Sequence, residues 1–390
     1  MSAEHIVIAG AARTPHGSLQ GRLKTLAAPI LGGIAIRGAL DCAGLAPDVP
    51  DEVFMGCVLA AGLGQAPARQ ASIAAGIPDR AGCSTVNKVC GSGMKAAMLA
   101  HDAILAGSAR VVVAGGMESM SNAPYLLKKA RGGYRLGHGE LYDHMFLDGL
   151  EDAYERGSLM GKFAEDTAEK YQFTRQAQDA FATASLGRAQ KATESGVFKD
   201  EIVPVHAEND DLTADEPVLR ADPNKIPLLK PAFREGGTVT AANSSGISDG
   251  AAALILMTER EAERRNVHPL ARFVGHASHA QTPAWFTTAP IGAIEKLLER
   301  TGWEKADVDL FEINEAFAVV ALAAMSDLNL PHEKVNVYGG ACAMGHPIGA
   351  SGARIVVTLL NALRQRDLKR GIASLCIGGG EATAMAVELI

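Results

Sequence analysis

Short apolar segments alternate with amphipathic or alanine-rich segments along the first third of the chain. Their lengths and periods distinguish buried strands from helices. The predicted strands are His5–Ala9, Asp51–Cys57, Ser84–Val89 and Arg110–Ala114, and the predicted helices are Thr25–Ala43, Pro67–Ala75 and Ser92–Ala106. This alternation is typical of α/β proteins and predicts a mostly parallel sheet with helices on both faces.

The same order of elements returns in the last third of the chain. The predicted strands there are Leu270–Gly275, Val308–Ile313 and Ile372–Ile377, and the predicted helices are Ile291–Thr301, Glu315–Ser326 and Ala350–Arg366. Segments Cys90–Ser119 and Ile348–Ala382 each contain a Gly-Ser-Gly type turn, a long helix, a basic turn, a strand and a Gly-Gly end. A duplicated α/β unit is the economical explanation, and chance similarity of two ordinary βαβ units is the alternative.

The segment between these halves is more polar and is marked by Gly and Pro. It contains two predicted helices, Lys162–Tyr171 and Arg175–Ser195, and Thr174 is the candidate N-cap of the second. A stretch this long is better explained as an inserted domain than as one loop. The predicted division is an N-terminal half at 1–120 plus about 242–268, a loop domain at 121–241 and a C-terminal half at 269–390.

Composition narrows the class of protein. The chain has 390 residues, 47% hydrophobic, with a net charge of −7 and no long run of one sign, which argues against a nucleic-acid partner. No apolar run is long enough to cross a bilayer and the first residues lack a signal pattern, so we expect no membrane partner and a cytoplasmic location.

Six cysteines are scattered along the chain without the paired short spacings of zinc sites. In a reducing compartment they predict neither disulfides nor a metal. The plain interpretation of any one of them is a small buried hydrophobic residue, so a functional role has to come from its context.

Cys90 and His346 both lie in glycine-rich turns that precede long helices. Cys90 follows a predicted strand, and a thiol at a helix N-terminus is expected to have a lowered pKa because it faces the positive end of the helix dipole. Histidine is the usual base for a thiol, although a histidine in a turn is more often a polar surface residue. If the two halves are duplicates, the two turns occupy equivalent positions and their helix N-termini approach one another.

Two further residues end predicted strands. Cys376 is followed by three glycines, whose backbone N–H groups could bind an oxyanion. Asn314 lies at a strand-to-helix junction, where its amide could hold a water or a carbonyl oxygen, or could simply cap the helix. Together these residues form a constellation suited to acyl transfer.

Six sequence motifs follow one another along the chain: VNKVCGSGMKA, GGMESMS, TAANSSGISDGAAA, NEAFA, GGACAMGHPIGASGAR and CIGGGEA. With these motifs in this order, the chain resembles the thiolase family over nearly its whole length. The resemblance implies two α/β halves stacked in five αβαβα layers, with a loop domain over the mouth of the site. It also implies condensation of two acetyl-CoA to acetoacetyl-CoA and CoA, or the reverse reaction, through a thioester on Cys90.

Residue roles follow from the same resemblance. Cys90 resembles the nucleophile, His346 the base that activates it, and Cys376 the acid/base that removes the α-proton of the second acyl-CoA. Asn314 would hold a water that binds the thioester oxygen together with His346. Backbone N–H groups of Cys90 and Gly378 would form the other oxyanion hole. No metal and no permanently bound cofactor is expected, because coenzyme A thioesters are the substrates.

The resemblance also assigns coenzyme A contacts. These positions are Leu150, Met160, Arg220, Ala232, Phe233, Ala241, Ser245, Ala316 and Phe317. Arg220 would meet the adenine end and Ser245 the pantetheine amide, whereas Phe233 and Phe317 could equally be core residues.

Two features bear on specificity and assembly. Leu159 stands where biosynthetic members usually have His, and Phe286 aligns near the acyl pocket, so acyl-chain preference is open. The basic segment Leu126–Gly137 could contact cofactor phosphates, another subunit or only solvent, and we favour the subunit contact. The family implies a homotetramer built as a dimer of dimers.

Three other functions are alternatives to this one. A degradative 3-ketoacyl-CoA thiolase with broader chain-length range shares the same motifs. A ketoacyl synthase shares the duplicated fold but pairs its nucleophile with two histidines, whereas the third position here is Cys376. A catalytically silent lipid carrier or scaffold is disfavoured because all four catalytic positions are intact.

Overall fold

The computed structural model describes residues 4–390, and its largest element is a ten-stranded sheet made of two halves. The strand order is β12-β13-β14-β11-β1-β10-β5-β3-β4, with the short strand β2 beside β10. The N-terminal half contains β1 (Ile6–Arg13), β2 (Gly17–Ser18), β3 (Glu52–Gly56), β4 (Gly82–Val86), β5 (Val111–Ser119) and β10 (Ser248–Thr258). The C-terminal half contains β11 (Ala271–Ala280), β12 (Leu310–Ile313), β13 (Arg370–Ile377) and β14 (Glu381–Leu389). Among residues 4–390, strands of the two halves pair with each other only where β1 meets β11, through two residue pairs.

The prediction of a mostly parallel sheet is wrong. Only β3 with β4, β3 with β5 and β12 with β13 are parallel, and every other pair in this sheet is antiparallel. The difference comes from β10 and β14, two strands that the sequence pattern did not mark. Both are alanine-rich and almost wholly buried, so neither shows the alternation of polar and apolar residues that identifies a half-exposed strand.

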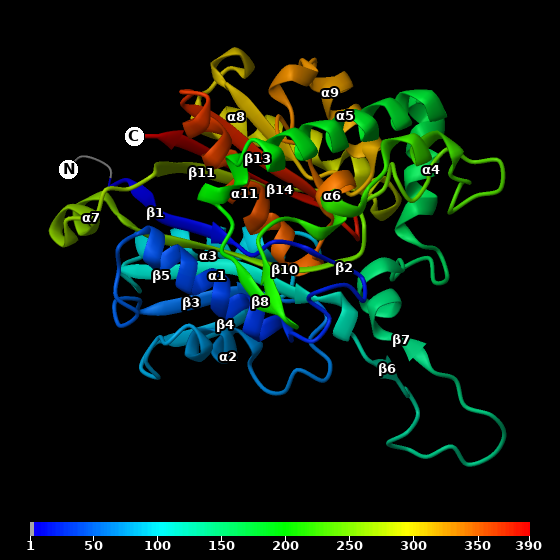
Figure 1. Cartoon of the computed structure of the whole chain (residues 1–390), viewed down its shortest axis with the longest axis horizontal. Coiled ribbons are helices and arrows are strands. Elements are labelled where there is room, and N and C mark those ends of the chain that lie inside the picture. Colours follow the sequence, from blue (N-terminus) through cyan, green and yellow to red (C-terminus); the bar gives the residue numbers. More distant parts are fainter. Residues whose placement is uncertain (1–3) are drawn as a thin grey trace.

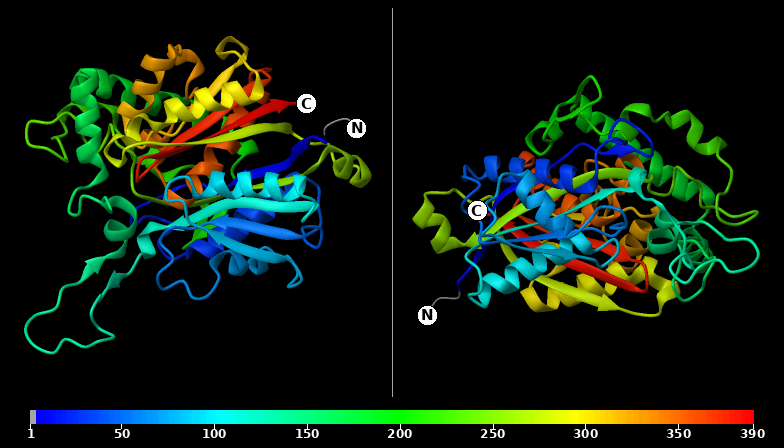
Figure 2. Two further views of the ribbon diagram at one scale, coloured as in Figure 1. Left: turned by 180° about the vertical axis from the view of Figure 1, so that it is seen from behind. Right: turned by 90° about the horizontal axis from the view of Figure 1, so that it is seen from below.

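Helices and sheet halves form five layers, which confirms the predicted αβαβα architecture (Figures 1 and 2). Helices α1 (Ala28–Cys42) and α2 (Pro67–Ala74) cover the outer face of the N-terminal half. Helices α8 (Ala289–Thr301) and α9 (Ala318–Leu328) cover the outer face of the C-terminal half. Between the two halves lie α3 (Ser92–Leu105) and α11 (Ile348–Gln365), inside a core that draws residues from both.

The two halves repeat one order of elements, as the matching segments predicted. In the position of β4, the C-terminal half has only an isolated parallel bridge between Phe311 and Val335. Helices α3 and α11 are equivalent and cross backbone to backbone at Gly93 and Gly352. A Cβ atom at Gly93 would lie 2.8 Å from the backbone nitrogen of Ala353, and one at Gly352 would lie 2.5 Å from that of Met94. Only glycine permits this approach, and it brings the two helix N-termini together.

The segment between the halves forms two longer helices and several short elements. The predicted helices correspond to α4 (Met160–Tyr171) and α5 (Arg175–Glu194), and Thr174 caps α5 by accepting a hydrogen bond from Ala177 N–H at 3.1 Å. The same segment also contains β6 (Tyr125–Leu126), β7 (Tyr142–Asp143), β8 (Val205–Ala207), β9 (Asp210–Leu212) and α6 (Glu216–Arg220), whereas α7 (Glu259–Arg265) follows β10 and α10 (Ala341–Met344) precedes α11. The β6–β7 hairpin extends away from the body of the protein (Figure 1). The proposed domain limits stay a prediction.

Within residues 4–390, every helix is too short or too polar to cross a bilayer.

The substitution Gly93→Ala should destabilise the protein, because the added methyl group meets the Ala353 backbone rather than a movable side chain. We expect a loss of about 1–3 kcal/mol in the free energy of unfolding, measured by urea titration. The control is Gly187→Ala in α5, where a Cβ atom meets nothing within 4 Å. That variant should gain about 0.5–1 kcal/mol. Equal stability of the two variants would contradict the backbone packing described above.

Candidate active site

A cavity of about 400 Å³ opens where the N-terminal turns of α3 and α11 meet. Cys90, His346 and Gly378 line it, and they come from the turn before α3, the turn before α11 and the turn after β13. Three of the five residues predicted to be catalytic are therefore on one wall. Cys376 and Asn314 do not line the cavity and are buried behind it.

Cys90 sits on a tight and strained turn. The preceding residue, Val89, has φ +47°, a left-handed conformation that costs a β-branched residue about 1–3 kcal/mol. Ser92 holds the turn closed, because its hydroxyl accepts from Lys88 N–H at 2.8 Å and donates to the Val89 carbonyl at 2.6 Å. Burial raises the pKa of the Cys90 thiol to about 11. The expected lowering by the helix N-terminus is wrong, because desolvation of the thiolate outweighs it.

Two backbone N–H groups donate hydrogen bonds to the Cys90 sulfur and partly offset the rise in its pKa. They belong to Gly378 and to Cys90 itself, the pair predicted to form an oxyanion hole. Gly378 leaves β13 ahead of Gly379 and Gly380, which have φ values of +91° and +90°. Donors that converge on one point in a dry site can stabilise negative charge on a nearby oxygen.

His346 is held as a neutral base. Its Nδ1 contacts the Ser351 hydroxyl, which itself donates to the Pro347 carbonyl at 2.9 Å. The Ser351 oxygen is therefore the acceptor, Nδ1 carries the ring proton, and Nε2 keeps a lone pair with no hydrogen-bond partner in the described residues. Burial lowers the pKa of His346 to about 3, and the charge of Arg354 adds to the effect. The imidazole is thus uncharged at neutral pH.

Cys376 is the penultimate residue of β13 and is fully buried. Burial raises the pKa of its thiol well above the usual range, and the nearby Cys90 raises it further. Cys90 lines the cavity, whereas Cys376 does not. A thiol in this environment holds its proton until a partner removes it.

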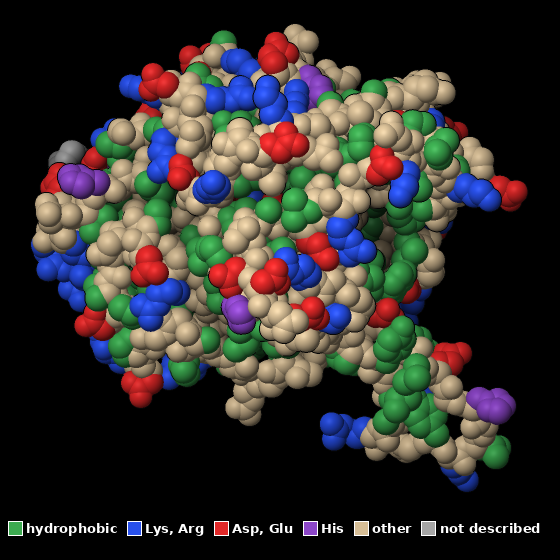
Figure 3. Space-filling model, in the orientation of Figure 1, with side chains coloured by type: hydrophobic (Ala, Val, Ile, Leu, Met, Phe, Trp, Pro, Cys, Tyr) green, Lys and Arg blue, Asp and Glu red, His purple; other side chains and the backbone are tan. Residues whose placement is uncertain are grey.

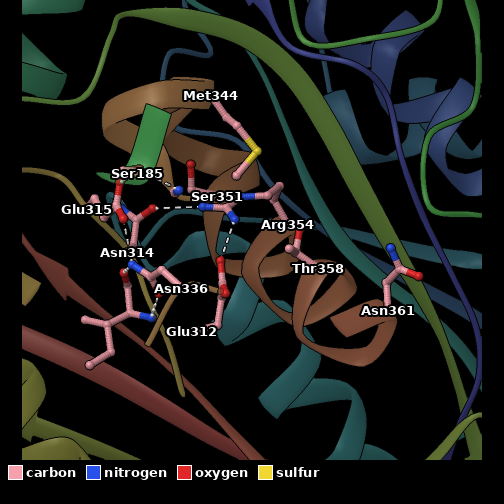
Figure 4. A network of polar contacts seen from close by, with 12 residues as sticks. Ser185, Glu312, Asn314, Glu315, Asn336, Met344, Ser351, Arg354, Thr358 and Asn361 are labelled. Carbon is pink, nitrogen blue, oxygen red and sulfur yellow. Dashed lines mark hydrogen bonds and ion pairs between the residues drawn. The ribbon is translucent and has the colours of Figure 1, made fainter. Parts of the chain in front are cut away.

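Asn314 is oriented by a buried arginine (Figure 4). Arg354 has no exposed surface, and its guanidinium donates to Glu312 at 2.9 Å and to the Asn314 side-chain oxygen at 3.4 Å. Because arginine can only donate, the amide oxygen faces it and the NH₂ group points away. That nitrogen has no partner within residues 4–390. The capping alternative is wrong, because α9 begins later and its N-cap is Phe317.

Glu118, in the GGMES motif, is a residue near the site whose role the sequence pattern did not predict. Its buried carboxylate accepts from the backbone N–H groups of Val58 and Leu59 at 3.0 Å and of Gly349 at 2.9 Å. It therefore ties the loop after β3 to the first turn of α11. Burial raises its pKa to about 7. The sequence signal that could have marked this residue is an acidic side chain near the end of a glycine-rich strand.

Comparison with known proteins gives the family. The chain matches the thiolase N-terminal domain over residues 6–260 and the thiolase C-terminal domain over residues 267–389. This protein belongs to the thiolase family. Relatives include acetyl-CoA acetyltransferase of Cupriavidus necator, 49% identical over 98% of this chain and 99% of its own, and acetyl-CoA acetyltransferase 2 of Arabidopsis thaliana, 50% identical over 99% and 97%.

Solved structures agree with this thiolase assignment. The crystal structure of the Bacillus anthracis acetyl-CoA acetyltransferase has a TM-score of 0.95 at 43% identity and covers 99% of each chain. The Acat5 thiolase from Ascaris suum in complex with coenzyme A has a TM-score of 0.94 at 43% identity, over 99% of this chain and 100% of its own.

Most residues assigned to coenzyme A line the thiolase cavity. These are Leu150, Met160, Ala232, Phe233, Ala241, Ser245, Ala316 and Phe317. Phe233 and Phe317 pack edge to face at 5.9 Å, so they belong to the core and to the cavity wall at once. Arg220 does not line the cavity and instead pairs with Glu216 at 3.2 Å. Its assignment to the adenine end stays a prediction.

The cavity wall also contains residues for which no coenzyme A contact was predicted. Leu159 and Phe286, singled out for acyl-chain preference, are both on it. The others are Leu19, Val89, Phe146, Gly149, Gly161, Ser244, Gly246, Ile247 and Ile348. Ser244, Gly246 and Ile247 fall inside the TAANSSGISDG motif, which was a usable signal. Leu19, in the turn after β2, and Phe146, the first residue of a short π-helix, belong to no such motif.

Alkylation of Cys90 by iodoacetamide should accelerate about tenfold per pH unit between pH 6 and 9, because a thiol with a pKa of about 11 gains thiolate throughout that range. The rate is measured by mass spectrometry of the Cys90 peptide, and the exposed thiol of Cys42 is an internal reference in the same digest. A Cys90 rate that is already maximal at pH 6 would reveal a thiolate–imidazolium pair and would contradict the neutral resting state.

Proposed function

We propose that this thiolase condenses two molecules of acetyl-CoA to acetoacetyl-CoA and CoA, and catalyses the reverse thiolysis, through a thioester on Cys90. The observation that carries the proposal is the meeting of the Cys90 thiol, two backbone donors and the free Nε2 of His346 at one cavity wall. The relatives named acetyl-CoA acetyltransferase support the choice of substrate.

In the first half-reaction, the Cys90 sulfur attacks the carbonyl carbon of acetyl-CoA. The resting pair is neutral, so the thiol proton moves to His346 Nε2 as the carbon–sulfur bond forms. The N–H groups of Cys90 and Gly378 hold the developing oxyanion. The carbon–sulfur bond to CoA then breaks, the CoA sulfur takes a proton from Cys376, and acetyl remains on Cys90.

In the second half-reaction, another acetyl-CoA enters the cavity. The Cys376 thiolate removes an α-proton, and the enolate oxygen is held by His346 together with a water bound to the Asn314 NH₂ group. The enolate carbon attacks the acetyl carbonyl, a carbon–carbon bond forms, and the bond to Cys90 breaks. The Cys90 sulfur then regains its proton from His346 Nε2, which returns the histidine to its neutral state. These reaction steps use only groups of the protein, one water and the substrates. We propose no permanently bound cofactor, since coenzyme A thioesters are the substrates.

Acyl-chain length is the finer point of the proposal. Leu159 gives the cavity wall an apolar side chain where biosynthetic members usually have a histidine, and Phe286 adds a second apolar side chain to the wall. An apolar wall of this kind accommodates a short acyl group without recognising its polar atoms. The degradative 3-ketoacyl-CoA thiolase is the second candidate, and the same two residues are the observation in its favour.

Incubation with acetyl-CoA should place one acetyl group on Cys90, detected by mass spectrometry after digestion, and Cys90→Ser should abolish it. Thiolysis should be fastest with acetoacetyl-CoA in a series of longer 3-ketoacyl-CoA substrates. Faster turnover of the longer chains would move the assignment to the degradative class. Absence of acetyl-Cys90 with every substrate would refute the mechanism.

Arg354 should act as a positioning residue for the second half-reaction. Arg354→Lys keeps a cation beside Glu312 but replaces the two guanidinium nitrogens that separately hold Glu312 and Asn314 with a single nitrogen, so we expect condensation to slow about tenfold to a hundredfold. Acetylation of Cys90, followed separately, should be nearly unchanged. Asn314→Ala should give a similar loss, and the double variant should lose no more than the worse single variant. Equal slowing of both half-reactions would indicate general structural damage instead.

We further propose that the protein works as a homotetramer, a dimer of dimers, in the cytoplasm. Two surfaces support the assembly. Strand β4 is the exposed edge of the sheet, and such edges favour pairing with another chain. The β6–β7 hairpin carries exposed apolar side chains, among them Tyr125, Leu136 and Leu141, beside its basic residues (Figure 3).

A further inference from the structure

Away from the cavity, α3 and β11 bring together a group of metal-ligating side chains that the proposed reaction does not use. His101 and Asp102 lie near the end of α3, and His276 lies within β11 of the other half. One oxygen of Asp102 is 3.2 Å from His101 Nδ1 and 2.9 Å from His276 Nε2. All three ligand atoms lie within 4.8 Å of one another.

The two imidazoles are fixed and the carboxylate is accessible. Only 13% of the His101 side chain and 16% of the His276 side chain are exposed, against 53% for Asp102. The rings meet edge to face at 5.1 Å, and Phe273 packs against His101 at 4.5 Å. The ligands are therefore held by packing, with an open side from which an ion and its waters can enter.

We propose that His101, Asp102 and His276 bind one Zn²⁺ ion per chain, with water in the remaining position. Two imidazoles and one carboxylate are an ordinary zinc donor set, and Zn–N and Zn–O bonds of about 2.0–2.2 Å place adjacent ligand atoms of a tetrahedral site roughly 3.3 Å apart. The observed 2.9 and 3.2 Å separations need only a small expansion to admit the ion. The alternative is a metal-free bridge in which the carboxylate accepts from both imidazoles.

The proposed site is structural rather than catalytic. His101 is eleven residues beyond Cys90, roughly 16 Å along α3, so the ion would be remote from the cavity. It would instead tie the helix of one half to a strand of the other. That link lies outside the proposed function and holds whichever acyl-CoA is the substrate.

Its affinity should be moderate. Histidine ligands of tight sites donate their second nitrogen to an acceptor, and His276 Nδ1 is buried without a partner in the described residues. Arg300 also donates to the His276 backbone carbonyl at 2.9 Å, which places a positive charge near the site. We therefore expect micromolar rather than nanomolar binding.

The test uses the full-length protein without a histidine tag, after treatment with a chelator. Zn²⁺ binding is measured by calorimetry, and Co²⁺ binding by its visible absorption. We expect one equivalent per chain, with Asp102→Asn at least tenfold weaker and His276→Gln weaker still. The control is His206→Gln, which removes a histidine from an exposed His–Asp pair, 72% and 59% exposed, and should bind as the wild type does.

Thermal unfolding gives a second readout. Zn²⁺ at a hundredfold excess over Kd should raise the wild-type Tm by about 3 °C, and should not raise that of Asp102→Asn. Asp102 is half exposed, so this variant is expected to fold even if His276→Gln does not. Binding that is absent from the wild type, or that is equally tight in Asp102→Asn, would overturn the proposal, since thiols and other surface groups would then account for any metal bound. Loss of acetyltransferase activity would not affect this result.

Discussion

The whole site depends on two glycines that let two helices touch through their backbones. At Gly93 and Gly352 the first turns of α3 and α11 approach more closely than any side chain would permit. Because these helices come from opposite halves, this contact aligns the turn that bears Cys90 with the turn that bears His346. The cavity is therefore a product of packing between duplicated units, since neither half holds a nucleophile and a base by itself.

Burial then decides the protonation states at this meeting point. Desolvation raises the pKa of Cys90 and Cys376 and lowers that of His346, so all three groups rest uncharged. The fixed charge in the vicinity is instead that of the buried Arg354, which pairs with Glu312, a carboxyl whose pKa burial raises to about 8. Such a pair is costly to bury and gives little net stability, but it fixes the orientation of neighbouring amides. In this protein the neighbouring amide is Asn314.

Local signals explain what could be predicted from the sequence. The turns at Cys90 and His346 combine glycines with the start of a long helix, and the helical period of α3 and α11 is clear, so both elements and their equivalence could be predicted. Strands β10 and β14 could not, because burial on both faces removes the alternation that marks a strand. The roles of Arg354 and Glu118 depend on partners 40 and 231 residues away, which no local pattern encodes. The raised pKa of Cys90 likewise depends on burial by distant segments.

The pairing of β1 with β11 has a consequence for circular permutation of the chain. Ala271 pairs with Ile8 on one side and with Leu389 on the other, so the strands that begin and end the fold flank a single strand. The start of β1 and the end of β14 lie on the same side of the molecule (Figure 1). A short linker between them would close the polypeptide into a ring, and the exposed tip of the β6–β7 hairpin offers a place to reopen it. Such a circular permutant would keep every contact between the halves while placing β1–β5 after the C-terminal half in the chain.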